Sequence, residues 1–175
     1  LTAISWAEKA SLTKDLFGDG TMSDPDHEKL IRWTRGEDVN DEDGDGQTTD
    51  ARKFLADPLH SEPKLIVYGG TESNPDTTVF FGDNQGYIHA VDGETGESYF
   101  SFMPKELLAN QATLMENAKS EGSRIYGMDG SIVSWVGASG PSEHVYLYSG
   151  MRRGGRNYYA LDATDRNAPK FKWSI

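Results

Sequence analysis

The residues best suited to chemistry lie in one acidic stretch, in which aspartates alternate with other residues. Asp41, Asp43 and Asp45 stand two positions apart, and Gly46 follows them. In a tightly turned loop, alternate residues direct their oxygens inward, so three carboxylates at this spacing can converge on one hard cation. A glycine in the sixth place allows the sharp turn that such a loop needs. The spacing therefore predicts a calcium (Ca²⁺) site, to which Gln47 offers its backbone carbonyl.

The end of this loop departs from the EF-hand pattern. Its twelfth position, counted from Asp41, is Arg52, where an EF-hand has a bidentate glutamate. Thr49 or Asp50 would then complete the ligand shell. Calcium is preferred to magnesium because several flexible carboxylates without a phosphate suit its larger shell, and to zinc because no His or Cys is near. The alternative is a solvated acidic loop that binds nothing, as most charge runs are.

Other candidate sites have weaker patterns. The four histidines are scattered without metal-ligand spacing, and we assign none of them to a metal. Ser139 lacks the glycine spacing of a nucleophile elbow, so the sequence does not favour serine hydrolysis. Three arginines surround a glycine pair between Met151 and Arg156. This turn either binds an anion through its amides and charges or is a tight connection into the next strand.

The composition excludes several classes of function. The chain has 175 residues, of which 36% are hydrophobic, so we expect a folded domain with a core. A net charge of −11 argues against a nucleic-acid partner or an anionic-lipid surface. The chain has no cysteine, and no apolar run approaches the roughly 18 to 20 residues that span a bilayer. Its first residues lack an export-signal pattern, so either the protein is cytosolic or the signal lies outside this sequence.

Helices are expected before the acidic loop and short strands after it. A thin apolar stripe of Ile4, Ala7 and Leu12 predicts a first helix that Gly18 and Gly20 close. Ser23 before Pro25 predicts a better one that ends near Gly36. Strands separated by turn residues are expected at 64–68, 77–81, 87–91 and 98–102. After an amphipathic helix that opens at 104 and ends at 122, further strands are expected at 131–136, 144–148, 157–161 and 171–174.

The two groups of strands are copies of one four-strand unit. The residues around Ala90, YIHAVD, match YYALD around Ala160, 70 residues later. One small meander cannot bury both of its faces, whereas copies stacked radially cover one another. We therefore predict a mainly β fold, a partial β-propeller with about two quinoprotein-like four-stranded blades and added α-helices. The alternative is an isolated antiparallel sheet with a helix across it.

The expected organisation has three parts. Residues 1–35 are a helical lead-in, 36–52 are the calcium-binding acidic loop, and 53–175 are the partial propeller. Within the propeller we expect one blade at 64–102, a helical insertion at 104–121 and a second blade at 131–174. Two blades do not close a propeller, so we expect the chain to be a fragment whose open edge favours self-association.

Three segments resemble those of a known family. LIRWTRGED from Leu30, DPLHSEP from Asp57 and GGRNYYALD from Gly154 occur in this order, as in the C-terminal domain of the PilC/PilY family. The resemblance covers nearly the whole chain from about residue 28. It implies a surface protein of a Gram-negative bacterium, at the tip of the type IV pilus or on the outer membrane, with roles in pilus biogenesis, adhesion and twitching motility. Its implied partners are pilins or minor pilins and a host or surface receptor.

The resemblance also implies a role for calcium, which in this family is linked to control of pilus extension against retraction. The ligands that it implies here are Asp41, Asp43, Asp45 and Gln47, with Thr49 or Asp50 as the last. Our main hypothesis is a calcium-dependent binding and assembly module, not an enzyme, in which the ion acts as a conformational switch. The alternatives are a quinone-dependent periplasmic dehydrogenase and an envelope assembly scaffold that does not depend on calcium.

Overall fold

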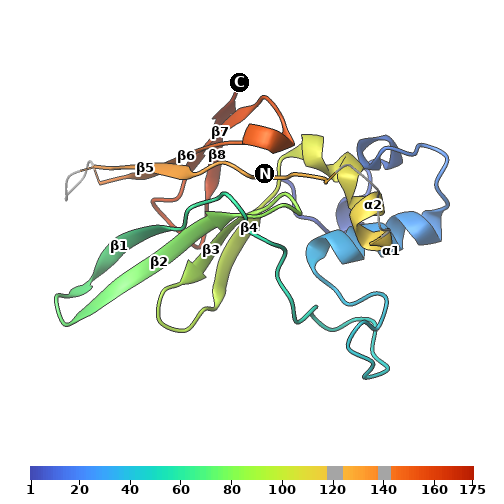
Figure 1. Ribbon diagram of the computed structural model, residues 1–175, viewed down its shortest axis with the longest axis horizontal. Coiled ribbons are helices and arrows are strands. Elements are labelled where there is room, and N and C mark those ends of the chain that lie inside the picture. The colour runs from blue at the N-terminus through green and yellow to red at the C-terminus, as the bar shows by residue number, and fades with distance from the viewer. Residues whose placement is uncertain (118–123, 138–142) are drawn as a thin grey trace. The chain divides into compact units, whose positions relative to one another are not determined.

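The computed structural model describes residues 1–117, 124–137 and 143–175 (Figure 1). Contacts divide the chain into two compact units. The first unit consists of Leu1–Leu55 and Lys105–Arg124, and the second of Ala56–Pro104 and Ile125–Ile175. The helical insertion thus groups with the N-terminal segment. Among the described residues, no helix has the length and apolar character needed to cross a membrane.

The first unit contains short helices. They are the 3₁₀ turns η1 (Trp6–Glu8), η2 (Lys14–Phe17) and η3 (Lys105–Asn110) and the α-helices α1 (Asp24–Arg35) and α2 (Gln111–Glu116). The start and end of α1 are as predicted. Ser23 is its N-cap and accepts a hydrogen bond from the amide of Asp26 at 3.2 Å, while Gly36 ends it with a left-handed φ of 106°. Its buried face, which includes Leu30 and Ile31, contributes to the core of this unit.

Two helix predictions are wrong. The stretch from Ile4 to Gly18 forms the two short turns η1 and η2 in place of one helix, because few of its side chains are apolar enough to bury a longer helical face. Gly18 does end η2, with a left-handed φ of 87°. The helix expected to run to Gly122 is a 3₁₀ turn followed by α2, and it ends at Asn117. Asparagine tolerates the left-handed conformation, here with φ 46°, that stops a helix. Residues 118–121 of the expected insertion lie outside the described residues.

The second unit confirms the predicted strands and the mainly β, partial-propeller fold (Figure 1). It has two four-stranded antiparallel meanders, with strand orders β1-β2-β3-β4 and β5-β6-β7-β8. The first comprises β1 (Lys64–Thr71), β2 (Asn74–Gly82), β3 (Ile88–Asp92) and β4 (Ser98–Phe102). The second comprises β5 (Ile132–Val136), β6 (Val145–Gly150), β7 (Tyr158–Asp162) and β8 (Lys170–Ser174). The first hairpin is longer than predicted because β1 continues past a bulge at Val67/Gly69.

The two sheets pack through one face of β1–β4. Phe80 of β2 and Ala90 of β3 are paired on this face, and both are fully buried. The rings of Phe102 of β4 and Tyr159 of β7 pack with their centres 6.0 Å apart. The hydroxyl of Tyr68 donates a hydrogen bond to the carbonyl of Ala163 at 2.8 Å. An apolar interface with a few directed hydrogen bonds thus joins the sheets, as stacking of blades requires.

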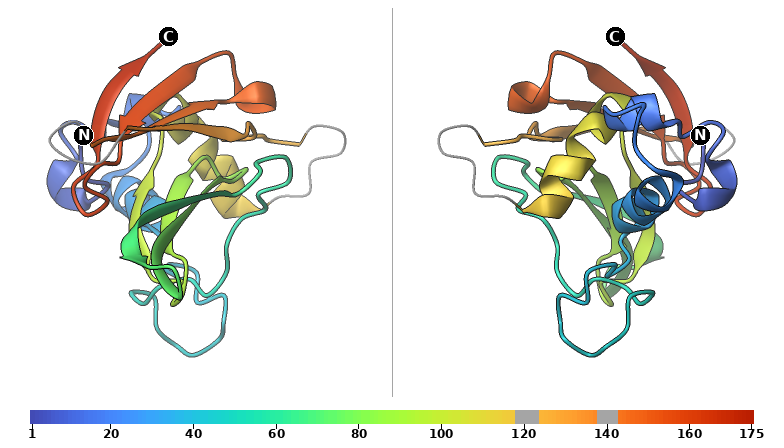
Figure 2. Two further views of the ribbon diagram at one scale, coloured as in Figure 1. Left: turned by 90° about the vertical axis from the view of Figure 1, so that its left-hand side faces the viewer. Right: turned by 90° about the vertical axis from the view of Figure 1, so that its right-hand side faces the viewer.

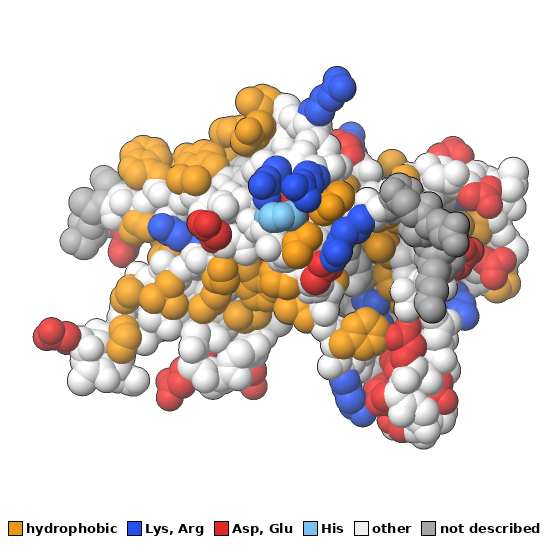
Figure 3. Space-filling model, viewed as in Figure 1, with side chains coloured by type: hydrophobic (Ala, Val, Ile, Leu, Met, Phe, Trp, Pro, Cys, Tyr) orange, Lys and Arg blue, Asp and Glu red, His pale blue; other side chains and the backbone are white. Residues whose placement is uncertain are grey.

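The outer faces carry large exposed hydrophobic side chains, as the space-filling view illustrates (Figure 3). Ile88 is 1% exposed, whereas Tyr158, its counterpart 70 residues later in the repeat, is 57% exposed. On the same side of the second sheet, Val133 is 63% and Trp135 is 56% exposed. The first sheet therefore has a covered apolar face, and the equivalent face of the second sheet is open.

The turn between β3 and β4 is built on Asp92. One carboxylate oxygen accepts the amides of Glu94 and Thr95 at 2.9 and 2.8 Å, and the other accepts the hydroxyl of Tyr99 at 2.7 Å. The hydrogen bonds from Thr95, Tyr99 and Glu94 hold the pKa of Asp92 far below its ordinary value. The repeat preserves this feature, because Asp162 accepts the amide of Thr164 at 3.1 Å.

We predict that Asp92 makes stability depend on pH. Because its folded-state pKa is depressed, its contribution is present above the ordinary aspartate pKa and is lost as pH falls toward the folded value. The urea midpoint of the wild type should fall more steeply below about pH 4 than that of Asp92→Asn. Urea unfolding followed by tryptophan fluorescence between pH 6 and pH 2 measures this. Parallel pH profiles for the two proteins would contradict the assignment.

We predict that the inter-sheet face, and not the outer face, stabilises the second unit. Phe80→Ala should lower the free energy of unfolding by about 3 to 5 kcal/mol, because it leaves a cavity between the sheets. Leu65→Ala, on the neighbouring strand with the side chain 58% exposed, should cost about 0.5 kcal/mol or less. Urea unfolding compares the variants, and similar losses for both would show that the sheets do not pack as described.

Candidate metal centre

The acidic loop follows α1 and returns to it (Figure 2). Its two ends are held by an isolated antiparallel bridge between Glu37 and Ala51. The amide of Asp38 donates to the carbonyl of Asp50, and the amide of Arg52 donates to that of Gly36, each at 2.9 Å. Because the ends are paired, the residues between them form a closed loop whose conformation is restricted.

Two arginines fix the loop to α1. Arg32 donates to the Glu37 carboxylate and to the carbonyl of Thr48, both at 2.6 Å. Arg52 donates to the carbonyl of Trp33 at 3.2 Å, and its guanidinium lies 4.2 Å from the centre of the Trp33 ring. Arg52, which breaks the EF-hand pattern at the twelfth position, therefore closes the base of this loop. Sequence spacing gave no signal for that role.

Asp38 is a structural anchor that the sequence analysis did not select. It is only 3% exposed, and its two carboxylate oxygens each lie 2.9 Å from the amide of Glu42. A longer contact of 3.4 Å joins it to the amide of Asp43. A carboxylate that accepts backbone amides stabilises a turn as it would a helix N-terminus. Asp38 thereby fixes the main chain from which Asp41, Asp43 and Asp45 project.

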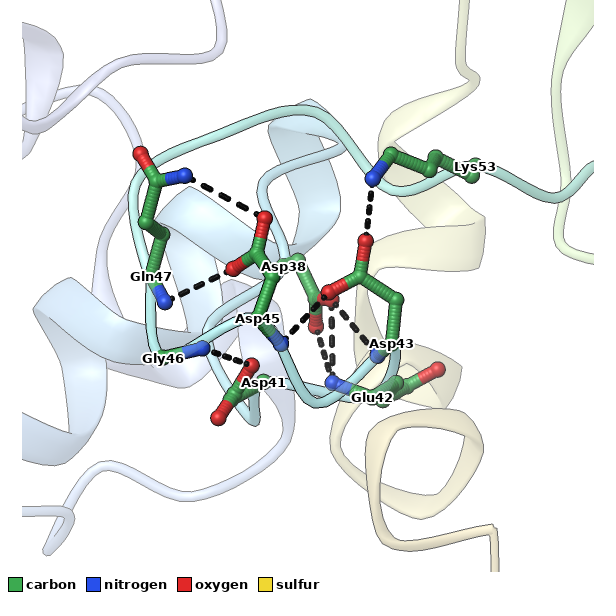
Figure 4. A network of polar contacts seen from close by, with 8 residues as sticks. All are labelled: Asp38, Asp41, Glu42, Asp43, Asp45, Gly46, Gln47 and Lys53. Carbon is green, nitrogen blue, oxygen red and sulfur yellow. Dashed lines mark hydrogen bonds and ion pairs between the residues drawn. The ribbon is translucent and has the colours of Figure 1, made fainter.

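Asp41, Asp43 and Asp45 are brought together as predicted. Each offers one carboxylate oxygen, and these oxygens all lie within 4.8 Å of one another. Figure 4 shows their side chains within one turn of the loop. Asp41 has a left-handed φ of 52°, and Gly44 and Gly46 have φ values of 74° and 84°. Those three backbone conformations produce the tight turns that carry alternate side chains inward.

Backbone amides inside the loop orient the three carboxylates (Figure 4). The amide of Gly46 donates to Asp41 at 3.0 Å, that of Asp45 donates to Asp43 at 3.2 Å, and that of Gln47 donates to Asp45 at 2.8 Å. Each hydrogen bond uses one lone pair of a carboxylate oxygen, and the second lone pair of that oxygen can still accept. The carboxylates therefore keep acceptor capacity while their positions are set.

Lys53 forms an ion pair with Asp43. The hydrogen bond from Lys53 lowers the pKa of Asp43, and the same bond raises the pKa of Lys53. The side chain of Lys53 is 69% exposed, so it can leave at little cost. The cluster thus already attracts one positive group, and a bound cation would compete with it.

The remaining predicted ligands lie around this cluster. The side-chain amide of Gln47 donates to Asp45 at 3.2 Å, so it supports a carboxylate. Thr49 is exposed. Asp50 belongs to the closing bridge, and among the described residues its buried Oδ1 makes no hydrogen bond. Its carboxylate is not one of the three that converge, and the last ligand stays a prediction.

The donor set fits calcium. It consists of carboxylate oxygens on an exposed loop, and hard, flexible oxygen ligands suit the loose shell of Ca²⁺. The departures are Lys53, which must release one oxygen of Asp43, and the absence of a bidentate glutamate at the position of Arg52. When bound, the ion would supply positive charge beyond that which Lys53 brings to Asp43.

Two histidines, left unassigned by the sequence analysis, pair with buried aspartates. His60 Nδ1 lies 2.7 Å from Asp129, and His89 Nε2 lies 2.9 Å from Asp83. These pairs join segments of the second unit and lie outside residues 36–52. His60 and Asp129 are 69 residues apart in the chain, so no local spacing could have indicated that they pair. Ser139 lies outside the described residues.

The sheets and the loop together define a class of protein. Two four-stranded meanders related by an internal repeat are blades of a β-propeller, and the segment that precedes them carries a cation-attracting acidic loop. A family comparison agrees with this class. The chain belongs to the PilY1 beta-propeller domain family, whose model matches residues 36–175. The matched range includes the acidic loop and all eight strands.

Individual relatives match at low identity. The type IV pilus biogenesis factor PilY1 of Pseudomonas aeruginosa (strain PAK) is 24% identical over 160 residues, which are 91% of this chain and 14% of that protein. The PilY1 homolog of Xylella fastidiosa is 27% identical over 61% of this chain and 9% of its own length. The crystal structure of the Pseudomonas aeruginosa PilY1 C-terminal domain is 30% identical, with a TM-score of 0.38, over 57% of this chain and 18% of that one.

We predict that Asp38 controls the order of the loop. Asp38→Ala removes the buried acceptor of the Glu42 amide, so hydrogen exchange at residues 41–46 should become about tenfold faster or more. Glu42→Ala, which removes an exposed acid from the same turn, should leave exchange nearly unchanged. Hydrogen exchange measured by mass spectrometry reports the loop and the strands in one experiment. Equal effects of the two substitutions would refute the anchoring role.

Proposed function

We propose that this chain is part of a type IV pilus biogenesis factor that works by binding and assembly, and that Asp41, Asp43 and Asp45 bind one calcium ion. The observation that carries the calcium proposal is the convergence of three carboxylate oxygens within 4.8 Å in a loop with paired ends. Gln47, through its backbone carbonyl, and Thr49 or Asp50 would complete the shell.

Calcium would act on the conformation of the loop. Three carboxylates at this separation repel one another, and the repulsion favours conformations in which they move apart. A doubly positive ion reverses the sign of that interaction and favours the converged arrangement. The base of the loop is held by Arg32 and Arg52, so the effect of the ion falls on residues 41–47. The ion therefore works as a local switch, and we assign it no catalytic role.

The biological setting is proposed from the relatives. Those from Pseudomonas aeruginosa are named as type IV pilus biogenesis factors, and the chain spans 14% of the length of each of the first two. We infer the same process here, with pilins or minor pilins and a surface receptor as partners and with roles in twitching motility and adhesion. The corresponding location is the cell surface of a Gram-negative bacterium, at the pilus tip or the outer membrane.

We predict opposite effects of two substitutions on calcium affinity. Asp45→Ala removes a ligand and should weaken calcium binding by about tenfold or more. Lys53→Met removes the positive group that competes for Asp43, so it should tighten binding by about two- to fivefold. Isothermal titration calorimetry of the 175-residue chain with calcium chloride measures both.

Glu94→Ala is the matched control, because it removes an acidic residue from an exposed turn of the second unit. It should leave the calcium affinity unchanged. Absence of a calcium-dependent heat in the wild type would overturn the calcium proposal and favour an assembly scaffold that does not depend on the ion. Weaker binding by the Lys53→Met variant would show that the ion binds elsewhere.

A further inference from the structure

A cluster of basic and aromatic side chains lies in the second unit. We call it the arginine cluster, and its members are His60, Tyr126, Asp129, Arg152 and Arg153. They come from three segments: the residues before β1, the residues before β5, and the connection between β6 and β7 that contains the 3₁₀ turn η4 (Arg152–Gly154). Figure 3 shows basic side chains gathered beside a histidine on the face that it presents. Such a gathering is unexpected in a chain with a net charge of −11.

One side of the cluster is organised by Asp129, which is 1% exposed. A carboxylate only accepts hydrogen bonds, so His60 donates from Nδ1 at 2.7 Å and its Nε2 is turned away from Asp129. The guanidinium of Arg152 lies 3.8 Å from the other carboxylate oxygen of Asp129. At this distance the two groups form an ion pair but no hydrogen bond. That oxygen, Oδ2, is buried and has no hydrogen-bond partner among the residues described.

The other side is organised by Tyr126. Arg153 donates to its hydroxyl at 3.2 Å, and the guanidinium lies 5.3 Å from the centre of the ring. The rings of His60 and Tyr126 lie 6.5 Å apart. Contacts therefore run from Arg152 through Asp129, His60 and Tyr126 to Arg153, with one guanidinium at each end of the series. Each arginine is positioned by a different partner.

The backbone around the arginines is specifically shaped. Arg152 has a φ of 52°, in the left-handed region that a non-glycine residue adopts at a cost. A Cβ on Gly154 would overlap the carbonyl oxygen of Gly127, so this position needs glycine for the two connections to touch. The close approach places η4 directly over the segment that carries Tyr126 and Asp129. The left-handed conformation of Arg152 thus lies two residues before a close contact between the two connections.

The charges of the cluster do not balance. Its five members include two guanidiniums and one carboxylate, of which Arg152 lies on Asp129 and Arg153 on Tyr126, and the side chain of Arg152 is 49% exposed. The planar guanidinium matches the oxygens of phosphate and carboxylate groups and binds them with paired hydrogen bonds. We propose that the arginine cluster binds an oxyanion, the chemistry that phosphate groups and carboxylates share, through Arg152 and Arg153. Asp129 and Tyr126 are positioning residues.

The test is a titration of the 175-residue chain with inorganic phosphate at constant ionic strength, followed by NMR of backbone and arginine side-chain signals. Saturable shifts centred on residues 126–129 and 152–153 are expected. Arg152→Gln and Arg153→Gln should each raise the Kd by about tenfold or more. Arg152→Lys keeps the charge but loses the planar fork, so it should have an intermediate affinity. Glutarate, a dicarboxylate, is titrated in parallel. Tighter binding of phosphate identifies a site for phosphate groups, and tighter binding of glutarate identifies a site for carboxylates.

Arg156→Gln is the matched control, because it removes the same charge from an exposed position of the same connection. It should change the Kd by less than about twofold. An equal loss in this variant would mean that only the general charge of the loop attracts the anion, and the proposal would fail. The proposal would also fail if the shifts did not saturate. Thermal unfolding of each variant checks its fold, and failure here would leave the calcium proposal intact, since no member of the cluster lies in residues 36–52.

Discussion

Repulsion between like charges is the constraint on which the acidic loop depends. One carboxylate oxygen from each of Asp41, Asp43 and Asp45 lies within 4.8 Å of the other two, and these like charges repel one another. The chain holds them there with backbone amides, a buried Asp38 and the clamp of Arg32 and Arg52 on α1. A loop that is only acidic needs none of these devices. Lys53 on Asp43 offsets part of the repulsion, and the proposed calcium site uses the same preformed oxygens.

The two sheets solve a different problem, that of burying both faces of a small meander. The first sheet buries Phe80 and Ala90 against the second. The hydrogen bond from the Tyr68 hydroxyl to the carbonyl of Ala163 links the two sheets. The same turn chemistry recurs in each copy, with Asp92 and Asp162 accepting amides of the residues that follow. Repetition of one unit therefore produces repeated turns and a repeated apolar face.

The parts that could be predicted from sequence depend on local spacing. Ser23 and Gly36 delimit α1 because capping is decided within one turn, and the strands follow from alternation and turn residues. The alternate aspartates likewise need only the geometry of a short loop. The end of α2 is missed by the sequence prediction, because asparagine adopts the left-handed cap conformation less often than glycine, which favours Gly122 over Asn117 as the end.

The parts that could not be predicted depend on contacts between distant residues. Arg52 departs from the EF-hand pattern, and its structural role depends on a contact with Trp33, 19 residues earlier, that local spacing does not reveal. The arginine cluster is built from three segments, and the sequence alone favours a simple tight connection at residues 151–156 over an anion site. Asp38 was one acid among seven between residues 36 and 50, and only burial distinguishes it from the others.

The most direct test of the account is a crystal structure of the chain grown with calcium, with anomalous scattering used to locate the ion. The account predicts one anomalous peak in the loop, with oxygens of Asp41, Asp43 and Asp45 at roughly 2.3 to 2.6 Å from it. A loop without a peak, whose three carboxylates point apart into solvent under the same conditions, would contradict it.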